Sequence, residues 1–278
     1  MILIDYNAIA ISNVIAGGID VQEDMVRHMI LNSIRMHRKT HKEKYGEVVI
    51  CCDGGKNWRK EYFPPYKHKR KSARKDSKLD WNELFRITHI VLEEIKANFP
   101  WKVVEVDECE ADDIIGELVR NTQEFGRFEN VMIISGDKDF AQLQNHSNVA
   151  QYSPTQKKFI KEDKPLLQLF NLIVKGDTSD GVPNVLSGDN VFVDEIRQTP
   201  LRQSKIDELL KNPECLGEEV YRNYKRNKKL IDLADTPDEI KKDIIKKYDS
   251  YVTPKENILN YLMEKRCRLL IECMADFV

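Results

Sequence analysis

The sequence predicts an α/β fold with a three-layered, mostly parallel sheet, and three observations lead to that prediction. Four short apolar runs rich in Ile and Val, at residues 2–4, 48–52, 103–106 and 131–134, are typical of buried strands. Helical patterns lie between them, and such alternation forms parallel sheets with right-handed crossovers. Acidic residues follow every run, as expected where parallel strands end at a ligand-binding edge.

The helices between the strands are predicted from their starting residues. The first crossover helix opens at Asp20, where Glu23 completes a capping-box pattern ahead of an apolar stripe. A second helix opens at a similar pair, Asp80 and Glu83, and a third follows Asp112. Each of these patterns precedes apolar residues at helical spacing, so each predicts a helix that packs on the sheet.

The character of the chain changes after the fourth run. Pro165 suits the first turn of a helix and Gly176 suits its end, and a turn-rich loop follows at 176–183. Beyond it, helical patterns dominate, with Pro213, Pro237 and Pro254 as separators. We expect two domains: an α/β domain over 1–185, which includes a basic arch at 54–80, and a helical C-terminal subdomain over 186–278.

Composition excludes several classes of protein. At 278 residues and 41% hydrophobic content the chain can bury a large core. The 44 basic and 46 acidic residues leave a formal charge of −2, so total charge indicates no partner. The six cysteines form no C-x-x-C pair typical of zinc or redox sites. An acid at position 5 and the lack of an apolar stretch of about 18 residues argue against a signal peptide and a membrane span, so we expect a cytoplasmic protein.

The acids at the strand ends predict a metal site. Asp5 ends the first run, Asp53 follows the second and Asp137 follows the fourth. Gathered carboxylates repel one another, and a hard divalent cation relieves that repulsion. A lone acid after a strand is more often a cap or turn residue, but acids at four strand ends indicate ligands. The full set is Asp5, Asp53, Glu110, Asp112, Asp113, Asp137 and Asp139, of which one in the third group could simply cap its helix.

A basic segment follows Asp53 directly. Residues 56–78 contain ten Lys or Arg against two acids, with four aromatic residues among them. Cations neutralise phosphates and aromatic rings stack on unpaired bases, so the segment favours contact with a single strand over a merely solvated loop. The candidate cationic contacts are Lys60, Lys69, Arg70, Lys71 and Arg74.

These motifs resemble the flap-endonuclease superfamily of 5′-nucleases over residues 1–185. Similar to its metal-binding segments are Leu3-Ile-Asp5, Cys52-Asp53-Gly54, Cys109-Glu-Ala-Asp-Asp113 and Ser135-Gly-Asp-Lys-Asp139-Phe-Ala-Gln-Leu143. Gly176-Asp-Thr-Ser-Asp180 is similar to its helix-three-turn-helix loop. Trp58-Arg-Lys and Tyr66-Lys67 look most like the T-even bacteriophage members, which have ribonuclease H activity.

The resemblance implies a PIN/5′-nuclease-like fold and two Mg²⁺ ions, for which Mn²⁺ substitutes. Asp177 and Asp180 would join the acids already named as ligands. Lys67 would contact the scissile phosphate, with Arg59 assisting and Tyr66 stacking on the nearby base. Asp137 would be essential for catalysis, which proceeds by in-line attack of water and leaves a 5′-phosphate and a 3′-hydroxyl.

The same resemblance implies a 5′-3′ exonuclease and flap endonuclease that removes RNA primers and adjacent DNA during phage replication in an infected bacterium. Its substrates would be RNA–DNA hybrids and branched or nicked duplexes. Neither terminus carries an obvious sliding-clamp peptide, so we expect a phage clamp or single-strand-binding protein to contact the helical subdomain. Two alternatives remain. One is a PIN-type ribonuclease, which is usually shorter and lacks the arch. The other is a non-catalytic DNA-binding replication accessory, although without metals the acids would repel the phosphates of the DNA.

Overall fold

The computed structural model describes residues 1–278 except 18–20, 125, 213, 215–216 and 256. The side chains of residues 71 and 72 are also outside the description. The predicted cap Asp20, the separator Pro213 and the Lys71 side chain therefore lie outside the described residues. In the part of the chain that is described, no helix is long and apolar enough to cross a membrane.

A six-stranded sheet in the order β3-β2-β1-β4-β5-β6 forms the centre of the molecule. The four predicted strands are confirmed as β1 (Ile2–Asp5), β2 (Val48–Cys52), β3 (Lys102–Glu105) and β4 (Val131–Ile134), all parallel. The structure adds β5 (Val149–Ser153), parallel to β4, and β6 (Lys158–Ile160), antiparallel to β5. The sheet is therefore mostly parallel, as predicted.

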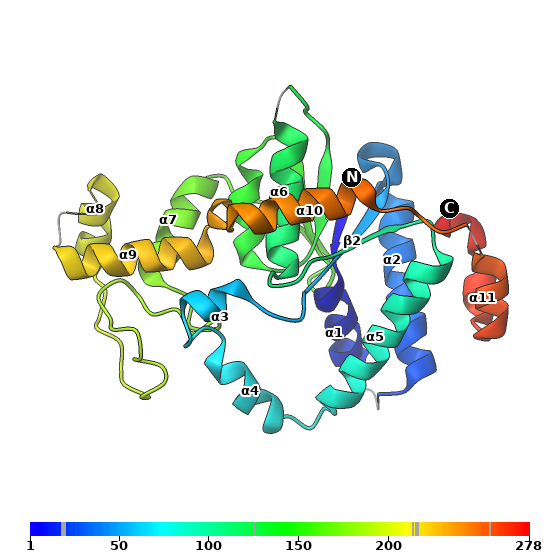
Figure 1. Ribbon diagram of the computed structural model, residues 1–278, viewed down its shortest axis with the longest axis horizontal. Helices are drawn as coiled ribbons and strands as arrows, with labels where there is room; N and C mark the ends of the chain where they lie inside the picture. Colours follow the sequence, from blue (N-terminus) through cyan, green and yellow to red (C-terminus); the bar gives the residue numbers. More distant parts are fainter. Residues whose placement is uncertain (18–20, 125, 213, 215–216, 256) are drawn as a thin grey trace.

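Helices cover both faces of this sheet, which gives the predicted three layers (Figure 1). Side chains alternate between the faces: Ile2 and Ile4 enter one core and Leu3 enters the other. The first core is covered by α1 (Tyr6–Gly17), α2 (Glu23–Tyr45) and α5 (Trp81–Asn98). The second is covered by α6 (Ala111–Gln123), the 3₁₀ helix η1 (Lys138–Asn145) and α10 (Asp238–Ser250).

The predicted helix starts are partly confirmed. Asp80 caps α5 by accepting the Glu83 N–H at 3.0 Å, as its sequence pattern indicates. For α2 the prediction is wrong about the start, because Glu23 is itself the first helical residue and Gln22 precedes it without a side-chain cap. Glu23 instead pairs with Arg27 one turn later, at 2.7 Å.

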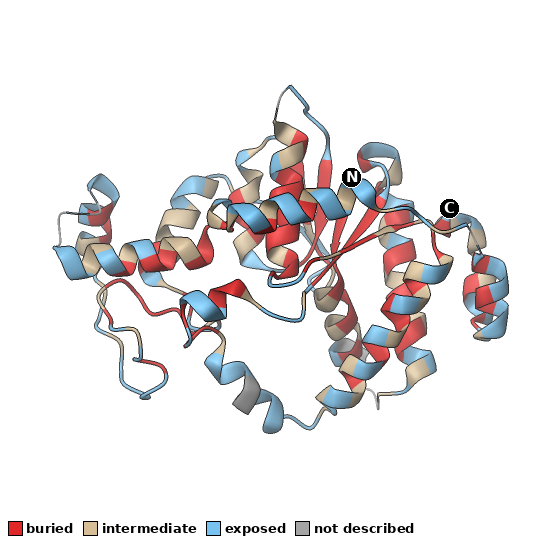
Figure 2. Ribbon diagram, in the orientation of Figure 1, coloured by how far each residue is buried: buried red, intermediate tan, exposed pale blue. Residues whose placement is uncertain are grey.

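The basic arch leaves the sheet after β2 and returns to it through α5. It contains α3 (Trp58–Tyr62) and α4 (His68–Lys75), and Figure 1 shows α4 at the lower edge of the view between α3 and α5. Figure 2 shows that α4 is largely exposed, whereas the strands are buried. Among the described side chains of α4, Lys69, Arg70, Arg74 and Lys75 are exposed.

The C-terminal part of the described chain is helical, as predicted. Pro165 begins α7 (Pro165–Lys175) and Gly176, at φ 69°, ends it. The later elements are α8 (Gln203–Lys211), α9 (Glu218–Ile231), η2 (Leu233–Asp235), α10, α11 (Ile258–Glu264), α12 (Arg268–Ile271) and η3 (Met274–Phe277).

The last helices pack back onto the sheet cores. Ile244 of α10 belongs to the core under α6, and Phe277 lies 5.5 Å from Phe99 and 6.0 Å from Trp101, measured between ring centroids. The C-terminal residues therefore share both cores with the α/β part. The domain boundary at 185 stays a prediction.

Candidate active site

Carboxylates from separate strand ends line one cleft at the carboxyl edge of the sheet. Asp5, Asp53, Asp112 and Asp137 all border it, and its volume is about 470 Å³. Asp5 accepts hydrogen bonds from the Ala8 N–H at 3.0 Å and the Ser135 hydroxyl at 3.1 Å. These bonds tie the start of α1 and the end of β4 to one carboxylate, so the parallel sheet itself gathers the acids.

Asp53 links the second strand to the third acidic group. Its Oδ1 accepts the Ala111 N–H at the start of α6 at 2.8 Å, and its Oδ2 accepts the Asn7 side-chain amide at 2.8 Å. A role for Asn7 was not predicted, although Asn7 lies two residues after Asp5.

Burial and mutual repulsion perturb the acids in this cleft. Burial, together with the charges of Asp53 and Asp137, raises the pKa of Asp5 to about 7. Burial also raises the pKa of Asp112 well above its usual range, and the charge of Asp137 adds to the effect. Perturbed carboxylates of this kind are typical of functional sites.

Asp139, Asp177 and Asp180 form a second acidic group. The charge of Asp137 acts both on this group and on Asp5 and Asp112. Burial and the charges of Asp137, Asp177 and Asp180 raise the pKa of Asp139 to about 7. Oδ1 of Asp139 is buried and has no hydrogen-bond partner. An unpaired buried carboxylate oxygen is costly, so this atom fits a position where a cation binds.

Asp177 and Asp180 lie in the loop that follows α7. Burial alone would raise the pKa of Asp177, but the Lys138 ammonium at 2.8 Å and Ser179 hold it below its usual range. The loop closes on itself through paired backbone hydrogen bonds of 2.8 Å between Asp177 and Val182. Both predicted loop acids lie near enough to Asp139 for their charges to raise its pKa.

The loop is attached to the arch. The Lys67 N–H donates to the carbonyl of Asp180 at 2.7 Å. Gly181 has φ 71°, and a Cβ at that position would lie 2.9 Å from the Pro65 carbonyl oxygen. The close approach of two backbones explains why glycine occupies this position.

Lys67 extends from the arch towards the acids. Its ammonium contacts Glu110 and lies 3.5 Å from Asp180, and its side chain borders the acidic cleft. Burial alone would raise the pKa of Glu110, but Lys67 and Arg59 lower it to about 2. The same carboxylates raise the pKa of Lys67 against the effect of burial, so a fixed positive charge faces the cleft.

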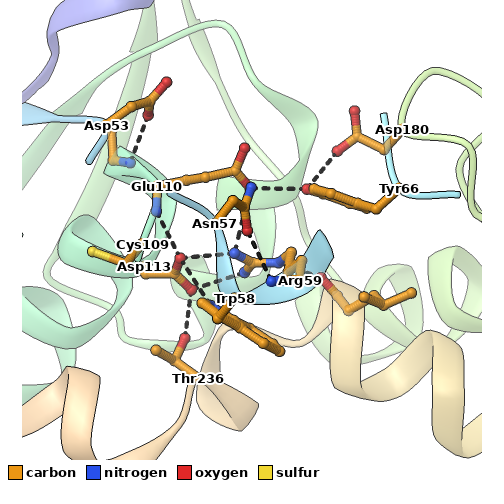
Figure 3. Close-up of polar contacts among 12 residues, drawn as sticks. Asp53, Asn57, Trp58, Arg59, Tyr66, Cys109, Glu110, Asp113, Asp180 and Thr236 are labelled. Atoms are coloured by element: carbon orange, nitrogen blue, oxygen red, sulfur yellow. Dashed lines mark hydrogen bonds and ion pairs between the residues drawn. The ribbon is translucent and has the colours of Figure 1, made fainter. Parts of the chain in front are cut away.

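The structure corrects the expectation for Tyr66. Its ring is 4% exposed and packs with Phe63 and Val182, while its hydroxyl lies 2.9 Å from Glu110 and 3.0 Å from Asp180 (Figure 3). A buried ring offers no open face to a base. Tyr66 instead holds two acids near Lys67.

A second correction concerns Arg59 and Asp113. Arg59 is 2% exposed and Asp113 is fully buried, and the guanidinium donates to both carboxylate oxygens at 2.7 and 2.8 Å (Figure 3). Asp113 also accepts from Trp58 Nε1 at 3.3 Å and from Thr236 Oγ1 at 2.7 Å. With its oxygens fully used away from the cleft, Asp113 is not placed to bind metal, and Arg59 is not placed to meet a phosphate.

The other candidate cationic residues belong to the arch itself. Lys60, Arg70 and Arg74 border a second cleft of about 710 Å³, which shares Asp53 and Lys67 with the acidic cleft. Arg70 pairs with Asp180 at 2.7 Å. Arg74 lies 4.9 Å from the Phe85 ring of α5, and the exposed Lys69 lies 5.7 Å from the Phe192 ring. The clefts therefore form one continuous surface, cationic on one side and acidic on the other.

The donor set fits hard divalent cations. In the described part of the chain, no three acidic, His or Cys side chains converge closely enough to hold an ion as they stand. Three of the acids instead contact ammonium or guanidinium groups: Glu110 with Lys67, Asp180 with Arg70, and Asp177 with Lys138. Oxygen donors that share one edge, with raised pKa values and one unpaired oxygen, have the chemistry that Mg²⁺ and similar ions require.

Comparison with known proteins extends this picture along the whole chain. Residues 1–170 match the family model described as the 5′-3′ exonuclease N-terminal resolvase-like domain, and residues 164–277 match the model of the T4 RNase H C-terminal region. The chain is 34% identical over 291 residues to the ribonuclease H of Enterobacteria phage T4, covering 99% of this chain and 95% of that protein. It is also 29% identical over 186 residues to DNA polymerase I of Bacillus caldotenax, of which the match covers 19%.

Solved structures share the fold. The flap endonuclease of bacteriophage T5, in a pseudo-enzyme–product complex with DNA and metal ions, superposes with a TM-score of 0.64 at 18% identity, covering 90% of this chain and 99% of that one. The T5 5′-exonuclease with bound zinc gives a TM-score of 0.60 at 17% identity, covering 88% and 98%. The motif resemblance and the predicted fold are thereby confirmed, and the chain belongs to the 5′-3′ exonuclease family of nucleases.

Proposed function

We propose that this chain is a magnesium-dependent 5′-nuclease that removes RNA primers and adjacent DNA during phage DNA replication. Its substrates are RNA–DNA hybrids and nicked or branched duplexes, cut from the 5′ side. The observation that carries the proposal is the convergence of Asp5, Asp53, Asp112 and Asp137 on one cleft beside Lys67. The family assignment supports the same activity.

Two Mg²⁺ ions, or Mn²⁺ in their place, occupy the two acidic groups in this proposal. Asp5, Asp53 and Asp112 hold one ion, Asp139, Asp177 and Asp180 hold the other, and Asp137 and Glu110 lie at their border. The shared repulsion between Asp137 and both groups supports this division. When bound, divalent cations supply positive charge to the reacting phosphate and favour deprotonation of the attacking water.

The remaining residues orient and stabilise the substrate. Lys67 contacts the scissile phosphate and stabilises the negative charge that grows in the transition state. Its position at the border of both clefts supports this role. Lys60, Lys69, Arg70, Lys71 and Arg74 bind the phosphates of the strand along the arch, which gives salt-dependent affinity.

The proposal is tested with 5′-labelled RNA–DNA hybrid, nicked duplex and flap substrates, each with Mg²⁺ and with EDTA. We expect short 5′ products from all three in Mg²⁺ alone. Asp137→Asn removes one charge without changing shape, so we expect it to abolish cleavage while duplex binding persists. The exposed acid Asp163→Asn serves as the matched control. Cleavage in EDTA, or products released from the 3′ end, would contradict the assignment.

We further propose that a phage single-strand-binding protein or sliding clamp binds the helical C-terminal residues. Leu259 and Met263 lie one turn apart on α11 and are 42% and 60% exposed, which supports an apolar contact there. The double variant Leu259→Lys with Met263→Lys should lose retention on each immobilised purified protein while keeping nuclease activity. Unchanged retention on both would remove this surface from consideration.

A further inference from the structure

One short segment, which spans the end of α9 and η2, contacts three elements of the proposed nuclease site: the arch, α6 and η1. The segment covers 230–236 and includes η2. The Leu230 carbonyl accepts from Arg59 Nε of the arch at 2.9 Å. The Thr236 hydroxyl donates to Asp113 Oδ1 of α6, the nearer of two acceptors at 2.7 Å, while the Leu233 carbonyl oxygen lies 3.0 Å away. Three separate parts of the nuclease site therefore meet one C-terminal turn, because η1 is bound there as well.

The contact with η1 runs through Gln142. Its side-chain nitrogen donates to the carbonyls of Ile231 at 3.1 Å and of Asp139 at 2.8 Å, and its oxygen accepts the Leu233 N–H at 2.9 Å. Gln142 therefore joins the backbone of a proposed metal ligand to the segment 230–236. Two of its three bonds would be lost if this segment moved.

The contact with α6 controls the start of that helix. Asp113 Oδ2 accepts the Glu110 N–H at 3.0 Å, and its two oxygens also bind the Arg59 guanidinium. Glu110 and Asp112 both lie within the three residues that precede this anchor. Figure 3 shows Thr236 and Arg59 approaching Asp113 from different elements.

These bonds are sheltered from water. Thr236 is 2% exposed, and neither Asp113 nor Arg59 has appreciable contact with solvent. A buried polar group that loses its partner finds no water to replace it, so the arrangement is held in one geometry. Gly116 adds a steric limit, because a Cβ there would lie 3.0 Å from Leu233 Cβ.

We propose that residues 230–236 form a positioning clamp for the nuclease site, in which the Thr236 hydroxyl sets the register of Asp113 and thereby of Glu110 and Asp112. Thr236 touches neither substrate nor metal and acts through Asp113. This inference rests on the proposed function, since it assigns the geometry of the same site. No local sequence pattern could indicate it, because Thr236 and Asp113 are 123 residues apart.

The test compares Thr236→Val, which keeps the shape and removes the hydroxyl, with Thr236→Ser, which keeps the hydroxyl. Misplacement of reacting groups by a fraction of an ångström lowers rates on the order of tenfold to a hundredfold. We expect that loss in the single-turnover cleavage rate of Thr236→Val, and recovery in Thr236→Ser. The Kd of a nicked duplex, measured by fluorescence anisotropy in EDTA, should stay unchanged in both.

The matched control is Thr122→Val. Thr122 is as buried as Thr236 and lies on α6, the helix that carries Asp113. Its hydroxyl, however, donates to the Val119 carbonyl of α6 at 2.6 Å. We expect its cleavage rate to equal that of the wild type. A second readout uses no catalysis: in metal-free protein the Glu110 amide should exchange with solvent faster in Thr236→Val than in wild type or Thr122→Val.

Three results would overturn the clamp: a wild-type cleavage rate and Glu110 exchange in Thr236→Val, equal losses in the valine and serine variants, or an equal loss in Thr122→Val. Failure of the wild-type protein to cleave any substrate would contradict the proposed function instead. In that case the exchange rate of the Glu110 amide still decides whether Thr236 fixes Asp113.

Discussion

At the scale of single residues, neighbours in the sequence take opposite roles. Asp112 borders the cleft, whereas Asp113 is fully buried against Arg59. Successive residues of a helix point in directions about 100° apart, so only one of two adjacent acids can face the strand ends. The sequence therefore predicted an acidic group correctly but not which member turns inward. The prediction for Tyr66 was wrong for a different reason, because aromatic character alone does not distinguish a stacking surface from a core residue.

Lys67→Ala should lower turnover more than affinity. The ammonium faces the acidic cleft, while binding is spread over many phosphate contacts, so we expect a loss on the order of a hundredfold in kcat. Lys60→Ala is the contrasting variant, because Lys60 is exposed and borders only the arch-side cleft. It should weaken binding and leave kcat unchanged. A Lys67→Ala enzyme with normal kcat and weak binding would refute the catalytic role.

His37 should make folding stability depend on pH. Burial and the neighbouring His41 lower the pKa of His37 from 6.5 to about 4. Between these two pH values, His37 is protonated in the unfolded chain and neutral in the folded protein. Stability contributed by neutral His37 is present above pH 6.5 and is lost as the pH falls towards 4. We expect His37→Gln to remove about 3 kcal/mol of this acid sensitivity in urea unfolding.

The control for His37 is His89→Gln, since His89 is exposed on α5. Its unfolding free energy should follow the wild-type pH profile. An unchanged profile in His37→Gln would show that burial does not keep this imidazole neutral.

At the scale of elements, hydrophobic periodicity and capping residues predicted the strands and helices that have strong local patterns. The four apolar strands and the helices α5 and α7 were found where their patterns place them. The strand β5 was missed because its inward positions include Gln151 and Ser153, which are buried but polar. Gln151 is satisfied by the carbonyls of Ser135 and Asp137, partners that only the folded sheet supplies. The pairing of β6 with β5 was likewise invisible to local patterns.

The contact between the arch and the loop after α7 is tested by Gly181→Ala. The residue has φ 71°, and its Cβ would lie 2.9 Å from the Pro65 carbonyl oxygen, so we expect a loss of about 1–2 kcal/mol in unfolding free energy. Cleavage should slow as well, because Lys67 hydrogen-bonds the neighbouring Asp180.

The control is Gly188→Ala, in the same segment between α7 and α8, because a Cβ there meets no atom within 4 Å. Its stability and activity should match the wild type. If Gly181→Ala behaved in the same way, the loop and the arch would not depend on this close approach.

At the scale of the whole molecule, residues near the C-terminus complete both sheet cores. Phe277, next to the last residue, is fully buried against Phe99 and Trp101 of the N-terminal half. Local patterns predicted helices near the C-terminus but not where they pack, because packing partners lie far away in the sequence. The location of the clamp segment 230–236 was hidden for the same reason.

Phe277→Ala should therefore destabilise the whole protein. Removing a buried phenylalanine costs about 3–5 kcal/mol, and we expect that loss in urea unfolding, with a single transition seen by both far-UV circular dichroism and tryptophan fluorescence. Leu269→Ala, at a side chain that is 66% exposed, should have little effect. Two separated transitions would instead indicate that the C-terminal residues fold independently.

The pairing of Lys67 with Glu110, and of Arg70 with Asp180, has a thermodynamic consequence for the proposed function. A cation that takes over these carboxylates frees the ammonium and guanidinium for phosphate, so metal ions and nucleic acid should bind with positive cooperativity. Reciprocity then fixes the magnitude in both directions: whatever factor Mg²⁺ contributes to substrate affinity, the substrate must return to Mg²⁺ affinity. Each of these ion pairs therefore opposes the binding of one ligand alone and favours the binding of both together.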